Sequence, residues 1–119
     1  MFALRAVHEL GIAAHILEIV RKNLPDGERV KVTRIHLQLG SLSSIVPSAL
    51  TACMQAVSRG TEAEGAELVF TEMPARARCR DCRAISEVAG PPLTCSSCGG
   101  MAVELLSGTE SFVASIEIE

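Results

Sequence analysis

The chain has 119 residues, of which 48% are hydrophobic, and this is enough to form the core of one ordinary domain. Its formal net charge of -3 at pH 7 argues against general attraction to nucleic acid or anionic lipid, which favour a strongly basic surface. With three Phe and neither Trp nor Tyr, the chain also has few rings on which bases could stack. We therefore expect proteins or small ions as partners, and no binding of nucleic acid or membrane.

The first half of the chain predicts a helix followed by a strand. Apolar residues recur at helical spacing from Leu10 to Val20, and the turn sequence Pro25-Asp26-Gly27 ends this helix. From Val30 to Leu39 apolar and polar residues alternate, which predicts a half-buried strand. Gly40 ends the strand, and the serines between positions 41 and 44 are expected to supply turn or cap groups.

A second helix is predicted to begin at Pro47, which suits the first turn of a helix. Its expected buried stripe consists of Leu50, Cys53, Met54 and Val57. Residues 67–73 alternate as a second strand, and residues 112–118 alternate as a third. In that last strand one face is predicted to hold Phe112, Ala114, Ile116 and Ile118.

Residues 35–58 lack Lys, Arg, Asp and Glu, but they contain His36, Gly40 and Pro47 and read as strand, turn and helix. Near the first residue, charged and polar side chains interrupt any apolar run of secretory type. We therefore expect a cytoplasmic protein. In a reducing compartment its five cysteines favour metal or redox chemistry over disulfides.

These elements together predict an α+β protein of two lobes. Two helices pack on a three-stranded β-sheet in the first lobe, which comprises residues 1–74 and 105–119. Residues 75–104 are rich in Gly, Pro, Ser, Cys and Arg and form a zinc-ribbon-like insertion.

Two CxxC knuckles carry the strongest chemical signal. Cys79-Arg80-Asp81-Cys82 and Cys95-Ser96-Ser97-Cys98 are separated by twelve residues, and each knuckle can direct two thiolates at one ion. Four protein ligands leave no open position, so we expect a structural zinc ion held by Cys79, Cys82, Cys95 and Cys98. A redox dithiol of thioredoxin type would need only one CxxC.

Four arginines lie beside the first knuckle: Arg76, Arg78, Arg80 and Arg83. They leave open an alternative function as a zinc-ribbon adapter or nucleic-acid-binding module. Nearby acidic residues nearly cancel their charge, which favours a solvated face around the tetrathiolate.

Five segments together resemble the HypA/HybF family. They are His8-Glu9-Leu10-Gly11-Ile12-Ala13, Leu39-Gly40-Ser41-Leu42-Ser43, the phrase from Gly60 to Leu68, the paired knuckles, and Glu104-Leu105-Leu106-Ser107-Gly108. The resemblance covers residues 7 to 119. Proteins of this family are nickel metallochaperones for NiFe-hydrogenase maturation, and some also serve urease.

The resemblance implies that His8 ligates nickel(II), with Glu9 contributing through its backbone amide or its side chain. Nitrogen ligands in a tetragonal arrangement suit Ni(II), whereas four thiolates suit zinc. Zn²⁺ is then a structural cofactor and Ni²⁺ a transferred cargo. The implied partners are the HypB GTPase and a NiFe-hydrogenase large-subunit precursor, with the protein a monomer or homodimer and not an enzyme.

The sequence departs from the family pattern at its start. Six residues precede Val7-His8, whereas the family places its histidine second, where the terminal amine can also ligate nickel. One hypothesis is that translation begins at residue 7, because a GTG codon reads as Val inside a gene and as Met at a start. The alternative is a native extension, in which nickel would use His8 with side-chain or internal amide ligands and His15 as a further candidate. A second departure is Val46, where some relatives have an acidic residue.

Overall fold

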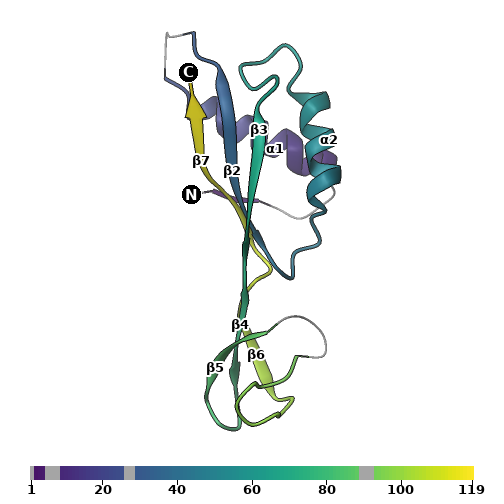
Figure 1. Ribbon diagram of the computed structural model, residues 1–119, viewed down its shortest axis with the longest axis vertical. Coiled ribbons are helices and arrows are strands. Elements are labelled where there is room, and N and C mark those ends of the chain that lie inside the picture. Colours follow the sequence, from purple (N-terminus) through teal and green to yellow (C-terminus); the bar gives the residue numbers. More distant parts are fainter. Residues whose placement is uncertain (1, 5–8, 26–28, 89–92) are drawn as a thin grey trace.

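The computed structural model describes residues 2–4, 9–25, 29–88 and 93–119. They form an elongated molecule with extents of 56 × 24 × 17 Å, in which two sheets lie end to end (Figure 1). The larger sheet has the strand order β1-β7-β2-β3, and the smaller has the order β5-β4-β6. No described helix is long and apolar enough to cross a membrane.

The first sheet and two helices confirm the α+β class. The helices are α1 (Glu9–Lys22) and α2 (Pro47–Val57). The strands β2 (Val32–Gly40) and β3 (Glu67–Met73) are parallel and are joined through α2, since parallel neighbours need a crossover. The strand β7 (Ser111–Ile118) returns from the second sheet and pairs antiparallel with β2.

The core lies between the helices and one face of this sheet. Alternation along β2 buries Ile35 and Leu37 against the helices, as predicted, while Arg34 and His36 lie on the other face. The α2 stripe is also confirmed, because Leu50 is buried and Cys53 packs at the edge of the core.

The sheet has one strand more than the three expected. The strand β1 (Phe2–Leu4) pairs antiparallel with residues 111–113 of β7. It lies within the segment that precedes Val7, and its pairing depends on a strand more than one hundred residues away, so local periodicity could not reveal it. A translation start at residue 7 stays a prediction.

The alternation predicted for the last strand is wrong at its beginning, at Phe112 and Val113, and right from Ser115 onward. The β2–β7 register shifts between His36 and Leu37, so that His36 pairs with Ser115 and Leu37 pairs with Val113. This bulge turns Val113, which is 5% exposed, into the core, whereas Phe112 lies opposite Gln38 on the other face.

The second sheet consists of β4 (Ala75–Cys79), β5 (Ile85–Val88) and β6 (Val103–Ser107), all paired antiparallel. Only Pro74 separates β3 from β4. Among the described residues, the fully buried members of the hydrophobic cluster of this second sheet are Ala75, Ala77 and Val88. The predicted division into residues 1–74 with 105–119 and 75–104 remains a prediction about folding units; the second sheet itself continues to Ser107.

Two glycines allow the chain to cross closely where the sheets meet. A Cβ added to Gly40 would lie 2.3 Å from the Gly108 carbonyl oxygen, and one added to Gly108 would lie 2.4 Å from the Ala75 Cβ. We call this junction, formed by residues 40–42, 73–75 and 108–110, the neck. Three backbone amides stabilise it: Gly40 donates to the Glu110 carbonyl, Leu42 donates to the Gly108 carbonyl, and Ala75 donates to the Ser41 hydroxyl. Ser41 lies in a turn, as expected, and its hydroxyl also joins the two sheets.

Candidate metal centres

The four predicted zinc ligands meet at the far end of the second sheet. The sulfur atoms of Cys79, Cys82, Cys95 and Cys98 all lie within 4.8 Å of one another, and these four residues form the one such group in the part of the chain that the structure describes. Two sulfur pairs are closest, Cys79 to Cys98 at 3.6 Å and Cys82 to Cys95 at 3.5 Å. The first cysteine of each knuckle is buried and the second is exposed.

The two knuckles repeat the same backbone turn. In the first, the amide of Arg83 donates to the Cys79 carbonyl at 2.9 Å, and in the second, Gly99 donates to Cys95 at 2.9 Å. The residue after each knuckle is left-handed, with φ of 64° at Arg83 and 74° at Gly99. Glycine adopts this conformation freely, whereas a side chain at Arg83 makes it costly.

The turns also aim backbone amides at sulfur. The amide of Cys82 lies 3.5 Å from the Cys79 sulfur, and that of Ser97 lies 3.4 Å from the Cys95 sulfur. The amides of Cys98 and Ser97 stabilise the Cys95 thiolate and lower its pKa to about 6. Such donors favour sulfur in its anionic form, which is the form that ligates metal.

Crowding of the thiols has the opposite effect on Cys98. The Gly100 amide acts to lower the pKa of Cys98. The surrounding thiols outweigh this effect, that of Cys79 most strongly, and raise the pKa of Cys98 to about 12. Four thiolates at these distances repel one another unless a cation lies between them. Tetrahedral Zn–S bonds of about 2.3 Å place the sulfurs about 3.8 Å apart, close to the observed spacing. The sulfur spacing of the quartet therefore fits a tetrahedral ion such as zinc.

The predicted nickel residues are described only in part. His8 lies outside the described residues. Glu9 is the first residue of α1, and its carboxylate accepts a hydrogen bond from the Val46 amide, with Oε1 3.3 Å from the nitrogen. Val46 is the N-cap residue of α2, and its side chain forms no capping hydrogen bond to the first turn of the helix. No sequence pattern indicates this contact, because the partner of the Glu9 carboxylate is a backbone amide 37 residues away.

The other two histidines lie apart from Glu9 in the fold. His15 is half-buried on α1. His36 is on the open face of the first sheet, where its Nε2 lies 2.7 Å from the Glu117 carboxylate. Arg34 contacts the same carboxylate at 3.4 Å, and a neighbouring cation makes a metal at this position unfavourable.

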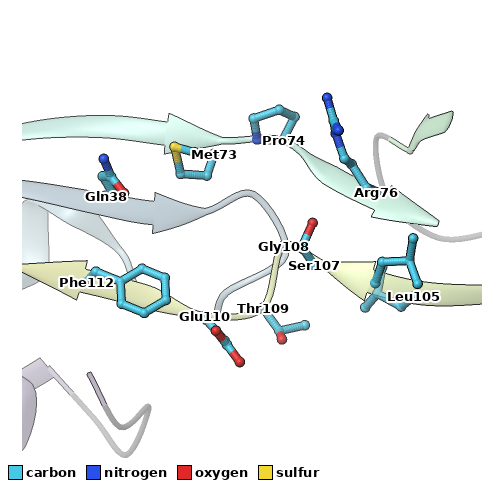
Figure 2. Close-up of a pocket in the computed structure, with 11 residues that line it drawn as sticks. Gln38, Met73, Pro74, Arg76, Leu105, Ser107, Gly108, Thr109, Glu110 and Phe112 are labelled. Atoms are coloured by element: carbon cyan, nitrogen blue, oxygen red, sulfur yellow. The ribbon is translucent and has the colours of Figure 1, made fainter. Parts of the chain in front are cut away.

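A cavity of about 400 Å³ opens where the two sheets meet (Figure 2). Phe112, which the bulge turns outward, lines it with Met73 and Leu105, and Arg76 and Glu110 stand at its rim (Figure 2). It contains neither cysteine nor histidine, so it belongs to neither metal centre.

A family described as "Hydrogenase/urease nickel incorporation, metallochaperone, hypA" matches residues 7–118. The chain belongs to the HypA family. Similar proteins include the hydrogenase maturation factor HypA of Desulfosudis oleivorans, 38% identical over 114 residues that span 95% of this chain and 99% of that one. The corresponding factor of Geotalea uraniireducens is 38% identical over 95% of this chain and all of its own.

Solved HypA structures share the fold. The solution structure of the Ni metallochaperone HypA from Helicobacter pylori matches with a TM-score of 0.65 at 16% identity, covering 94% of this chain and 97% of that one. A second HypA solution structure matches with a TM-score of 0.59 at 19% identity, covering 93% and 92%. Membership of the HypA family disfavours the alternative of a zinc-ribbon adapter without a nickel role.

Proposed function

We propose that the protein is a nickel metallochaperone that binds Ni(II) near its N-terminus and delivers it for NiFe-hydrogenase maturation, with urease as a second possible recipient. The observation that carries this proposal is the family match, which begins at residue 7 and so includes His8 and Glu9. Those two residues are the proposed nickel site, in the lobe made of residues 1–74 and 105–119.

The quartet of Cys79, Cys82, Cys95 and Cys98 is proposed to hold a structural zinc ion in the lobe of residues 75–104. Its support is the sulfur spacing and the amides directed at sulfur. Two of the three buried residues in the described part of the second sheet's hydrophobic cluster are alanines, so apolar burial contributes little to the stability of this sheet. Metal binding would supply the missing stabilisation. Binding free energy of zinc in such modules is on the order of 10 kcal/mol and acts as folding free energy.

Separation of the two metals follows from ligand chemistry. Thiolates hold zinc in a closed shell, whereas few nitrogen ligands leave nickel free to move to the next protein. The HypB GTPase and a hydrogenase large-subunit precursor are the proposed partners, in the cytoplasm. Transfer of an ion breaks no covalent bond of a substrate, so we propose no catalytic residue.

Nickel titration of the purified, zinc-loaded protein tests the function. The variant His8→Ala should lose specific nickel uptake, whereas His15→Ala, which removes a histidine from the middle of α1, should bind as the wild type does. Zinc content should stay the same in both variants. Nickel uptake by His8→Ala equal to that of the wild type would overturn the proposal.

Metal analysis tests the zinc site separately. Cys79→Ser should lose zinc, while Cys53→Ser, which alters a cysteine on α2, should retain it. Stoichiometric zinc in Cys79→Ser would contradict the assignment.

A further inference from the structure

The cavity of about 400 Å³ where the two sheets meet, which we call the neck cavity, is lined by residues 38, 73–74, 76, 105–110 and 112. By strand alternation, Met73 and Phe112 share with Gln38 the face of the first sheet that is turned away from the core (Figure 2). Leu106 lines the cavity from β6 and is 43% exposed, and Met73 is 40% exposed. Three strands from two sheets thus bring apolar side chains to one hollow, and exposed apolar groups that gather in this way mark binding sites.

The backbone shapes this hollow. The bulge in β7 turns Phe112 out of the core and places it opposite Gln38. Gly108 lines the cavity without a side chain, and a Cβ added to it would lie 2.4 Å from the Ala75 Cβ. Because bulge and crossing are parts of the fold itself, the neck cavity is formed before any partner binds, as ligand sites usually are.

Two charges of opposite sign stand at the rim. Arg76 belongs to β4 in the second sheet, whereas Glu110 immediately precedes β7 in the first, and both are exposed (Figure 2). Glu87 is the register neighbour of Arg76, but it lies on β5, on the side of β4 away from β6. In the ranges that the structure describes, all ion pairs join other side chains. Arg76 and Glu110 are therefore both available to an occupant of the cavity.

An apolar centre with charged groups around it is the usual anatomy of a protein interface, in which Phe, Met and Arg are enriched. The polar side chains of the lining are exposed or half-buried, so the cavity lacks the buried polar group that orients a small molecule. We propose that the neck cavity is the docking site for an extended segment of a partner protein, in which a large apolar side chain lies between an acidic and a basic residue. The acidic residue faces Arg76 and the basic residue faces Glu110. This inference goes beyond the proposed function and does not depend on nickel.

Two peptides test the proposal: acetyl-Gly-Glu-Phe-Lys-Gly-amide and acetyl-Gly-Lys-Phe-Glu-Gly-amide. Their two orders cover both directions in which a segment can cross the cavity. Heteronuclear NMR of the zinc-loaded, nickel-free protein measures where each peptide binds and how tightly. At least one of them should shift the amide signals of residues 105–112, with a Kd on the order of 1 mM. Replacing Phe by Ser in that peptide should abolish the shifts, because the apolar contact is lost.

Charge variants of the protein test the rim. Arg76→Gln and Glu110→Gln should each weaken binding of the peptide about 3-fold, the worth of one exposed ion pair. Arg78→Gln and Glu104→Gln are the matched controls, because these residues lie on β4 and β6 outside the cavity, and they should leave the Kd unchanged. Arg76→Glu should bind acetyl-Gly-Lys-Phe-Lys-Gly-amide more tightly than the wild type does.

A second pair of variants tests the apolar lining. Met73→Ala should weaken binding about 10-fold, whereas Met101→Ala, which alters a methionine that is 73% exposed outside the cavity, should not. The absence of shifts with both peptides, or equal losses in the cavity variants and their controls, would overturn the proposal. Free phenylalanine that binds as tightly as either peptide would indicate a small-molecule site instead and would overturn it as well.

Discussion

Adding one methyl group at the neck should destabilise the protein far more than adding it elsewhere. Alanine substitutions at three glycines distinguish the two causes of destabilisation, which are backbone strain and steric overlap of the added Cβ. Gly60 has φ of +74° and no atom within 4 Å of an added Cβ, so Gly60→Ala meets only backbone strain. Gly40 has no such strain but would bring a Cβ to 2.3 Å from a backbone oxygen, and Gly108, with φ of +116°, combines both problems.

The expected losses follow from these contacts. Left-handed backbone costs a non-glycine residue about 1 kcal/mol, which is the expected loss for Gly60→Ala. Overpacking costs about 3 kcal/mol where the neighbour cannot move aside, and at Gly40 the neighbours are the carbonyls of Gly108 and Glu110. Gly108→Ala, at 2.4 Å from the Ala75 Cβ, should lose about 4 kcal/mol. That is a large part of the stability of an ordinary domain.

Urea unfolding of the zinc-loaded protein, followed by far-UV circular dichroism, measures these losses. The order of destabilisation should be Gly108→Ala, then Gly40→Ala, then Gly60→Ala. Heteronuclear NMR spectra of the two neck variants should change in both sheets, because the neck joins them. A Gly108→Ala protein no less stable than Gly60→Ala would refute the close crossing.

Three further outcomes are expected. In the zinc-loaded state the free energy of unfolding of Arg83→Gly should be about 1 kcal/mol higher than that of Arg83→Ala, because only glycine adopts the left-handed backbone at φ of 64° without strain. Equal denaturation midpoints would contradict this. Removal of zinc by a strong chelator should greatly increase amide exchange across residues 75–107 and leave that of β2 nearly unchanged; uniform exchange in both would speak against a metal-dependent lobe. The hydrogen bond from His36 lowers the pKa of Glu117 below its ordinary 4.5, so this stabilisation is present above pH 4.5 and is lost as the pH falls below it. The gap in melting temperature between the wild type and Glu117→Gln should therefore close in acid, and a gap constant down to about pH 3 would refute the effect.

Local pattern was sufficient for most of the secondary structure. The period of α1, the alternation of β2 and the ends of these elements at Lys22 and Gly40 each depend on nearby residues, so they can be read from the sequence. The knuckles are equally local, since two residues between cysteines suffice to turn both sulfurs toward one point.

Contacts between distant segments could not be read in this way. The strand β1 exists through pairing with β7, and the bulge in β7 depends on its register against β2. A bulge reverses the alternation between the two parts of a strand, so a simple alternation that places Ile116 correctly assigns the wrong face to Val113, on the other side of the bulge.

The sequence by itself predicted which residues carry metal chemistry, because ligand type and spacing are properties of short segments. Tertiary structure alone decided how those residues are supported. The bond between Glu9 and Val46 and the crossing of Gly40 with Gly108 each join segments that lie far apart along the chain. Such contacts arise only when the sheet and helices are packed together, since a backbone amide or a missing Cβ leaves no distinctive pattern in the sequence.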